Sequence, residues 1–155
     1  IDKKVYPKQI AFNSIPFVDC FLENNYTREE MKMVWETHKI LDENISVNPT
    51  AVRVPVLVGH AESIYIETEK EIDIELAKNC LNEFAGISVI DNVQEVDFPT
   101  SFEHGHGTDD VYVGRIRKGL SKNNSLNLWV VADNVRKGAA LNSIQIAENL
   151  VGSKM

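Results

Sequence analysis

Hydrophobic residues recur at helical spacing in a clear stretch near the start of the chain. The segment Thr27-Arg28-Glu29-Glu30 matches a capping box, in which the Thr hydroxyl and the Glu carboxylate satisfy backbone donors at a helix start. The apolar positions that follow at this spacing are Met31, Val34, Trp35, His38 and Leu41. They predict a helix with one buried stripe, which ends between Asp42 and Asn44.

A β-branched run extends from Ala51 to His60. Alternate valines from Val52 to Val58 would share one face, so this run predicts a strand. Pro55 has no N–H to donate to a sheet ladder, and it therefore implies a sheet edge or a bulge. The segment from Ser63 to Thr68 predicts a second strand.

Two further helices are expected later in the chain. Asp73 is the expected cap of a helix that continues through Phe84, with Gly86 as its stop signal. The last helix is expected from Gly138 to Val151. Its apolar stripe comprises Leu141, Ile144, Ala147 and Val151.

Three more strands are expected, at Ile87 to Ile90, Val111 to Arg117 and Leu126 to Ala132. A polar segment from Ser121 to Ser125 joins the last two, which favours an antiparallel pair. Residues 93–109 have the composition of a loop. The pattern predicts one α+β domain over residues 1–155, with a mixed or antiparallel sheet covered by helices.

Composition and charge restrict the class of protein. The 155 residues are 43% hydrophobic and 25% charged, which is typical of a globular domain. The net charge of -7 argues against a nucleic acid or an anionic membrane as partner, because both attract clustered Lys and Arg. No apolar run approaches the roughly 20 residues of a membrane helix, and no leader segment is visible. Two cysteines without metal spacing favour a reducing, cytoplasmic setting.

Candidate chemistry begins on the first predicted helix. Glu36 and Lys39 are three residues apart and so lie on one helical face, away from the apolar stripe. From the residues alone, a solvated ion pair of little energetic value is the favoured interpretation. His38 lies on the apolar stripe, where a packed histidine is favoured over a ligand.

The valine-rich run carries a second candidate pair. Arg53 is costly to bury unless it meets an anion, and its planar guanidinium suits a carboxylate. His60 follows Gly59, where a break in the backbone would turn its side chain into a cleft, and histidine can transfer protons near neutral pH. In a regular strand the side chains of residues 53 and 60 would point to opposite faces of the sheet. They can face one site only if Pro55 or Gly59 interrupts the pleat. Taken alone, an outward-facing arginine and a loop histidine remain the simpler interpretation.

Two other features are interpreted conservatively. His104-Gly105-His106 with Asp109 and Asp110 invites a metal hypothesis, but two histidines in a glycine-flanked loop are a weak signal, and a solvated loop is favoured. Cys20 and Cys80 are each expected to act as small core hydrophobes rather than as reactive thiols.

Collinear segments across the chain resemble aspartate-semialdehyde dehydrogenases. The segments that carry the resemblance are Gln9-Ile10-Ala11-Phe12-Asn13, Tyr26 to Lys32, Glu36 to Lys39, Arg53-Val54-Pro55-Val56, Gly59-His60, Val113 to Arg117, Leu128 to Asn134, and Arg136-Lys137-Gly138-Ala139-Ala140. The resemblance implies a fold similar to the C-terminal domain of glyceraldehyde-3-phosphate dehydrogenase-like enzymes. It also implies reduction of L-aspartyl 4-phosphate to the semialdehyde with NADPH, through a cysteine thioester, on the route to lysine, methionine and threonine.

The resemblance also implies roles for individual residues. His60 would be the catalytic acid/base, Arg53 would bind the substrate carboxylate, and Glu36 its ammonium group. Lys39 would contact phosphate, and Asn134 would contact the cofactor near the nicotinamide. A zwitterionic amino-acid phosphate needs ionic partners of these kinds. No bound metal is implied.

The resemblance covers the substrate-binding and dimerisation part of such an enzyme. The dinucleotide-binding domain and the segment with the nucleophilic cysteine are absent from these residues, and neither Cys20 nor Cys80 stands in a matching context. We therefore expect these residues alone to be inactive, with NADP bound mainly by the absent domain. The expected partners are a small-molecule substrate and further copies of the chain, in a homodimer or homotetramer. The alternative is a non-catalytic dimerisation module, and a metal-binding role for His104 and His106 is a third hypothesis.

Overall fold

The computed structural model describes residues 5–152. The chain divides into two compact units, the first ending at Pro55 and the second beginning at Val56. We describe the two units separately, as the first unit and the second unit.

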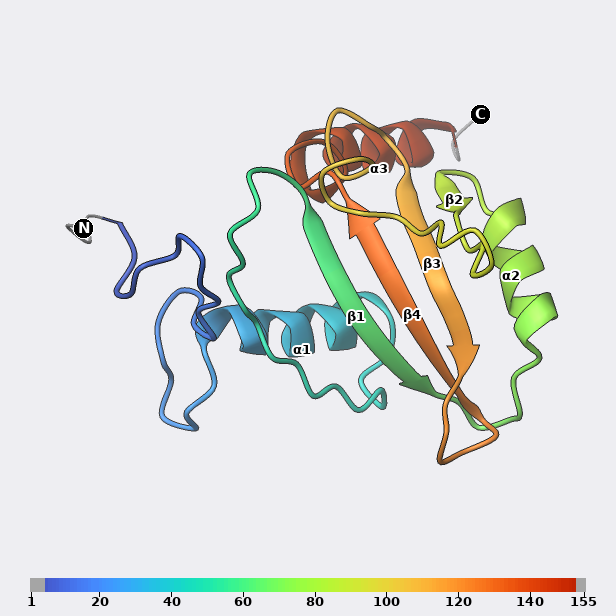
Figure 1. The fold of residues 1–155 in the computed structure, drawn as a ribbon, viewed down its shortest axis with the longest axis horizontal. Coiled ribbons are helices and arrows are strands. Elements are labelled where there is room, and N and C mark those ends of the chain that lie inside the picture. Colours follow the sequence, from blue (N-terminus) through green and yellow to red (C-terminus); the bar gives the residue numbers. More distant parts are fainter. Residues whose placement is uncertain (1–4, 153–155) are drawn as a thin grey trace. The chain divides into compact units, whose positions relative to one another are not determined.

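The first unit contains helix α1, Arg28–Ile40 (Figure 1). Its start is the predicted capping box. The Glu30 N–H donates to the Thr27 hydroxyl at 3.2 Å, and the Thr27 N–H donates to Glu30 Oε2 at 2.7 Å. Both side chains are buried, and the helix ends two residues before the predicted boundary. The prediction of this helix and of its cap is confirmed.

The apolar stripe of α1 is less covered than its spacing predicts. Trp35 is 51% exposed and Leu41 is 72% exposed, while Met31 and Val34 are half-buried. His38 is half-buried, and its Nε2 lies 2.8 Å from the Ile45 carbonyl oxygen, as expected of a packed histidine. The prediction of one fully buried stripe is therefore wrong, because periodicity identifies an apolar face and not what covers it.

The predicted strand from Ala51 to His60 is also wrong. Residues 51–59 form no strand and contribute only an isolated antiparallel bridge between Arg53 and Ile15. Val52 and Val54 are exposed, at 44% and 47%. A strand needs a partner for its backbone groups, and Pro55 has no N–H to offer one. The β-branched residues favour the extended backbone, but pairing stops after a single residue.

The second unit is built on a four-stranded mixed sheet. Its strands are β1 (His60–Glu67), β2 (Ile87–Val89), β3 (Val111–Lys118) and β4 (Ser125–Ala132). The order is β1-β4-β3-β2, with β4 antiparallel to both of its neighbours and β2 parallel to β3. The predicted antiparallel pairing of β3 with β4 is confirmed, and so is the α+β class with a mixed sheet.

One face of this sheet packs against helix α2, Ile74–Glu83 (Figure 1). Asp73 caps the helix by accepting the Leu76 N–H at 2.8 Å, as predicted. Val113, Ile116, Leu126 and Leu128 form the buried core cluster. The α2 residues packed against that cluster are Ile74, Ala77 and Leu81.

Cys80 lies on the other face of α2 and is exposed, so its assignment to the core is wrong. Its neighbours Leu76 and Phe84, four residues away on either side, are 62% and 67% exposed. Residues four apart share a helical face, which explains why all three point away from the core together. Cys20 is half-buried in the first unit, and both thiols are free.

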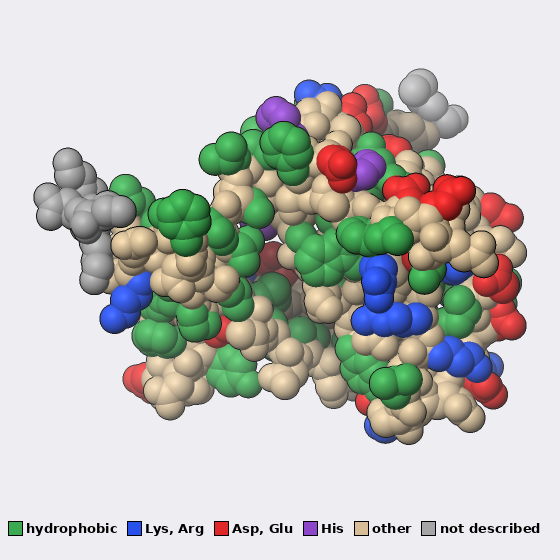
Figure 2. Space-filling model, viewed as in Figure 1, with side chains coloured by type: hydrophobic (Ala, Val, Ile, Leu, Met, Phe, Trp, Pro, Cys, Tyr) green, Lys and Arg blue, Asp and Glu red, His purple; other side chains and the backbone are tan. Residues whose placement is uncertain are grey.

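The chain closes with a π-helical turn, Arg136–Ala140, followed directly by helix α3, Leu141–Gly152. The predicted last helix is confirmed: the π-helical turn begins two residues before the predicted start at Gly138, and α3 begins three residues after it. The apolar stripe expected on this helix is largely uncovered, since Ile144 is 55% exposed and Val151 is 62% exposed. Figure 2 shows hydrophobic side chains reaching the surface of the molecule at several places. None of the helices formed within residues 5–152 has the length and apolarity needed to cross a bilayer.

Candidate functional site

His60 stands at the end of the sheet where β1 begins and β4 finishes. It is the first residue of β1 and pairs with Ala132, the last residue of β4. The chain continues from Ala132 into Asp133 and Asn134, and the Asn134 Oδ1 accepts the Gly59 N–H at 3.2 Å. The structure therefore brings His60 and Asn134, two candidates 74 positions apart, to one end of one sheet.

Gly59, the residue before His60, has an unusual backbone conformation. Its φ of +79° lies in the region that L side chains rarely adopt. A Cβ on Gly59 would lie only 2.7 Å from the carbonyl oxygen of Gly105. Backbone strain and close approach both select glycine, so the position of His60 depends on a tight fit between two glycine-containing segments.

Gly105 belongs to the loop for which the sequence suggested either solvent or a metal. The loop is ordered by its own hydrogen bonds: the Thr100 N–H donates to His104 Nδ1 at 3.2 Å, and the Thr108 hydroxyl donates to the His104 carbonyl at 2.7 Å. Gly105 is buried, and the His104 ring packs 5.2 Å from the Tyr112 ring. The prediction of a solvated loop is thus wrong for His104 and Gly105, while His106 and Asp109 are exposed as expected. His104 has a structural role here, and residues 5–152 contain no group of three His, Cys, Asp or Glu side chains arranged for a metal ion.

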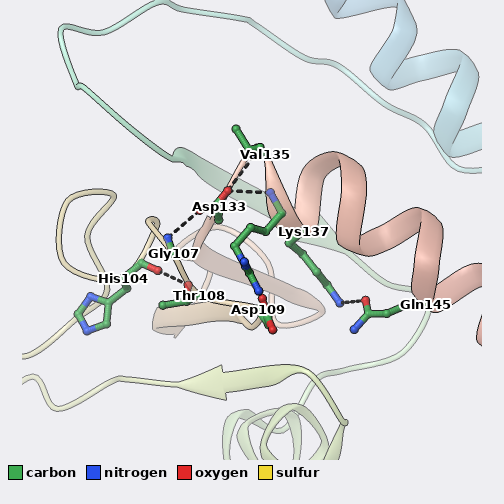
Figure 3. A network of polar contacts seen from close by, with 9 residues as sticks. His104, Gly107, Thr108, Asp109, Asp133, Val135, Lys137 and Gln145 are labelled. Carbon is green, nitrogen blue, oxygen red and sulfur yellow. Dashed lines mark hydrogen bonds and ion pairs between the residues drawn. The ribbon is translucent and has the colours of Figure 1, made fainter.

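Asp133 anchors this loop to the end of β4. Asp133 is 5% exposed, and its carboxylate accepts three backbone N–H groups, from Val135 and Arg136 at 2.8 Å each and from Gly107 at 2.7 Å (Figure 3). The hydrogen bonds from Arg136 and Gly107 hold the pKa of Asp133 below its ordinary value, against the opposing effect of burial. Sequence analysis missed this residue, because its partners lie on both sides of it and up to 26 positions away.

The other three candidates lie in the first unit. Glu36 and Lys39 are exposed on α1, and they form no ion pair with each other among the interactions of residues 5–152. The same spacing of three does form an ion pair two turns earlier, where Lys32 contacts Glu29 at 3.3 Å. The charges of Glu36 and Lys39 are thus both presented to solvent.

Arg53 is half-buried and held by its backbone. It exchanges two hydrogen bonds of 2.9 Å with Ile15, and its guanidinium carbon lies 5.0 Å from the centre of the Tyr6 ring. Within residues 5–152 it pairs with no carboxylate. Stacking on an aromatic ring leaves the edge of a guanidinium, which carries its N–H donors, available for an anion.

Glu30 connects α1 to the segment that carries Arg53. Besides its role in the capping box, the carboxylate accepts the Ala51 N–H at 2.9 Å through Oε1. The sequence identifies the capping box, but nothing in it predicts this third bond across 21 positions. Hydrogen bonds from the Thr27 and Ala51 N–H groups hold the pKa of Glu30 below its ordinary value of 4.5.

We expect Glu30→Ala to lower the free energy of unfolding by about 2–3 kcal/mol, because it removes a cap and leaves the partly buried Ala51 N–H without its acceptor. Since the folded pKa is depressed, this contribution is present above pH 4.5 and is lost as the pH falls through the folded value. The variant should therefore also lose less stability on acidification than the parent. Urea denaturation at pH 7 and pH 4 measures both effects.

The matched control is Glu29→Ala, on the same turn but paired only with Lys32 at the surface. It should cost less than about 1 kcal/mol. Equal losses in the two variants would show that neither the capping box nor the bond to Ala51 stabilises the fold more than a surface ion pair does.

Comparison with known proteins identifies the family. The family model described as semialdehyde dehydrogenase, dimerisation domain, matches residues 1–137. The chain belongs to this family. An aspartate-semialdehyde dehydrogenase of Shewanella violacea is 58% identical over 97% of the chain, and aspartate-semialdehyde dehydrogenase 2 of Vibrio cholerae is 52% identical over 97%. The chain spans 44% of the length of each of these relatives.

Solved structures support the same assignment. Aspartate semialdehyde dehydrogenase II from Vibrio cholerae, complexed with ASA, superposes with a TM-score of 0.93 at 51% identity, over 99% of this chain and 45% of that one. The aspartate semialdehyde dehydrogenase with NADP from Candida albicans gives 0.73 at 26% identity, over 91% of this chain and 45% of that one. The resemblance that the sequence motifs carried is therefore confirmed at the level of family and fold.

Proposed function

We propose that this chain is a single functional domain that binds substrate and dimerises in an NADP-dependent aspartate-semialdehyde dehydrogenase. The reaction is the reduction of L-aspartyl 4-phosphate to L-aspartate 4-semialdehyde, with release of phosphate. The hydrogen bond between Gly59 and Asn134 is the observation that carries the proposal. It sets the proposed acid/base, His60, beside the proposed cofactor contact.

Substrate recognition is assigned to the first unit. Arg53 binds the α-carboxylate through its planar guanidinium, and stacking on Tyr6 restricts the orientation of that group. Glu36 binds the α-ammonium group, and Lys39 contacts the phosphate. Both are exposed, so each can meet an ionic group of the substrate without first breaking an internal ion pair.

His60 is assigned the proton transfers. A thiolate is the nucleophile in thioester formation, so the cysteine thiol must lose its proton before it attacks the acyl phosphate. His60 takes that proton and returns it to the thiolate that leaves when the thioester, once reduced by hydride, breaks down to the aldehyde. In this proposal the cysteine comes from the part of the enzyme outside these residues, and His60 approaches it from the end of the sheet.

Asn134 is assigned to the nicotinamide. Its Oδ1 is engaged by the Gly59 N–H, and the side chain is exposed, so its NH₂ group is directed to a further acceptor such as the nicotinamide amide oxygen. An amide NH₂ donor suits the carbonyl oxygen of the nicotinamide amide. Bound NADPH supplies the hydride that reduces the thioester.

The enzyme is proposed to be a homodimer or homotetramer that acts in the cytoplasm, in the biosynthesis of lysine, methionine and threonine. The exposed apolar side chains support an assembly. Trp35 on α1 and Ile144, Leu150 and Val151 on α3 are each more than half exposed, and apolar surface of this kind favours burial against a partner.

An assay of the protein encoded by the parent gene tests the proposal. With L-aspartate semialdehyde, phosphate and NADP, it should form NADPH in a phosphate-dependent reaction, and residues 1–155 alone should form none. Arsenate in place of phosphate should also support turnover, because it is an oxyanion of the same shape and charge. A full-length protein that folds and dimerises without turnover would favour the alternative, a non-catalytic dimerisation module.

A further inference from the structure

The loop of residues 100–108 has no role in the proposed function, yet it is ordered and partly buried. Its only buried carboxylate partner in the described part of the chain is Asp133, whose Oδ2 accepts the Gly107 N–H at 2.7 Å. Figure 3 shows Asp133 between this loop and the turn that begins α3, with the His104 ring pointing away from it. Asp133 therefore joins two segments through one side chain.

The first connection from Asp133 leads to Gly59 through the turn after β4. Its Oδ1 accepts the Val135 and Arg136 N–H groups at 2.8 Å each, which folds the chain back over Asn134. Asn134 lies inside that turn, and its Oδ1 receives the Gly59 N–H. The turn thus fixes the acceptor that holds the residue before His60.

The second connection leads to Gly59 through the loop. The bond from Gly107 fixes one end of the loop, and the bonds to His104 and Thr100 fix its interior. Gly105 is buried between them, and its carbonyl occupies the space where a side chain on Gly59 would lie. The backbone of the loop therefore packs closely against Gly59.

We propose that Asp133 is a positioning residue for His60, acting through both connections on the peptide that precedes it. This inference rests on the proposed role of His60. Gly59 has a positive φ and no side chain, so by itself it would leave the start of β1 free to move. Two contacts of Gly59, one with the Asn134 side chain and one with the Gly105 carbonyl, are both set by Asp133; they remove that freedom and hold the imidazole at one place relative to Asn134.

Asp133→Asn in the full-length enzyme tests the loop connection with the least change of shape. An asparagine can still accept from Val135 and Arg136 through its oxygen, but its NH₂ group faces the Gly107 N–H, and two donors cannot bond. We expect kcat to fall about 10- to 100-fold, as misplacement of a catalytic group does, with KM for aspartate semialdehyde unchanged within about threefold. Hydrogen exchange at Gly107 and Gly59 should become faster.

The matched control is Asp109→Asn. Asp109 accepts from Arg136 Nε at 2.5 Å at the surface of the same region, and in the described part of the chain it makes no hydrogen bond to Gly107, Asn134 or Gly59. Its kcat should stay within about twofold of the parent, as expected for a surface ion pair. Equal losses of kcat in the two variants would overturn the proposal.

The same substitution in a His60→Ala background separates positioning from general damage. If Asp133 acts through His60, Asp133→Asn should lower the residual kcat of His60→Ala by no more than about twofold, because coupled residues are not additive. A full and additive loss overturns the proposal and leaves the function of His60 intact. A His60→Ala enzyme with normal kcat instead refutes the proposed function itself.

Discussion

In the full-length enzyme, His60→Ala should lower kcat by about 10²- to 10⁴-fold, the usual contribution of a positioned acid/base. The physical reason is that the nucleophilic thiol then has no partner to take its proton. KM for aspartate semialdehyde should change by less than about threefold, because Arg53, Glu36 and Lys39 still bind the ionic groups of the substrate. Steady-state kinetics with varied semialdehyde at saturating phosphate and NADP measure both constants.

His106→Ala is the matched control for this experiment. His106 is exposed and belongs to the loop that borders Gly59, but it is not the residue that begins β1. Its replacement should leave kcat within about twofold of the parent, as expected of a surface substitution. A His60→Ala enzyme whose loss is confined to KM would assign this histidine to binding.

Local sequence signals predicted the helices because the interactions that begin them are local. Thr27 and Glu30 are three residues apart, and Asp73 caps an amide three residues later, so both caps are visible in a short window. The same reasoning failed for residues 51–59. Their β-branched side chains favour an extended backbone, but a strand also needs a partner, and within residues 5–152 their only pairing is that of Arg53 with Ile15, 38 positions earlier.

The site shows the same division between local and distant contacts. Side-chain chemistry and a family motif identify Arg53 and His60 as candidates, and both of these signals can be read without knowledge of the fold. The residues that hold them, Glu30 and Asp133, act through Ala51 and Gly107, which are 21 and 26 positions away. A carboxylate that accepts several backbone N–H groups has no composition signature, since the groups it binds occur in almost every residue.

The exposed apolar stripes of α1 and α3 have a different cause. Periodicity correctly found the apolar faces, but it also assumed that the chain covers them itself. The relatives are more than twice as long as this chain, and the family model is that of a dimerisation domain. An apolar face in such a domain is expected to be covered by another part of the assembly. An apolar stripe on α1 or α3 therefore does not imply that the stripe is buried within these residues.

Replacing Arg53 should affect binding rather than chemistry, the opposite of His60. A charge-assisted hydrogen-bonded pair contributes about 1.5–3 kcal/mol, so Arg53→Ala should raise KM for aspartate semialdehyde about 10- to 150-fold. Arg53→Lys should recover only part of this loss, because an ammonium group cannot bind a carboxylate in the bidentate way. Tyr6→Leu, which removes only the stacked ring, should raise KM about two- to fivefold.

A substrate without the α-carboxylate makes this prediction specific. The parent enzyme should use 3-aminopropanal far less efficiently than aspartate semialdehyde, because the guanidinium of Arg53 then faces no anion. Arg53→Ala should lose this discrimination, with kcat/KM for the two aldehydes within about threefold. In this variant the α-carboxylate of aspartate semialdehyde has no cationic partner, so its presence no longer favours binding. If the variant still prefers aspartate semialdehyde as strongly as the parent does, the α-carboxylate is bound by another residue and Arg53 serves only the packing of Tyr6 and Ile15.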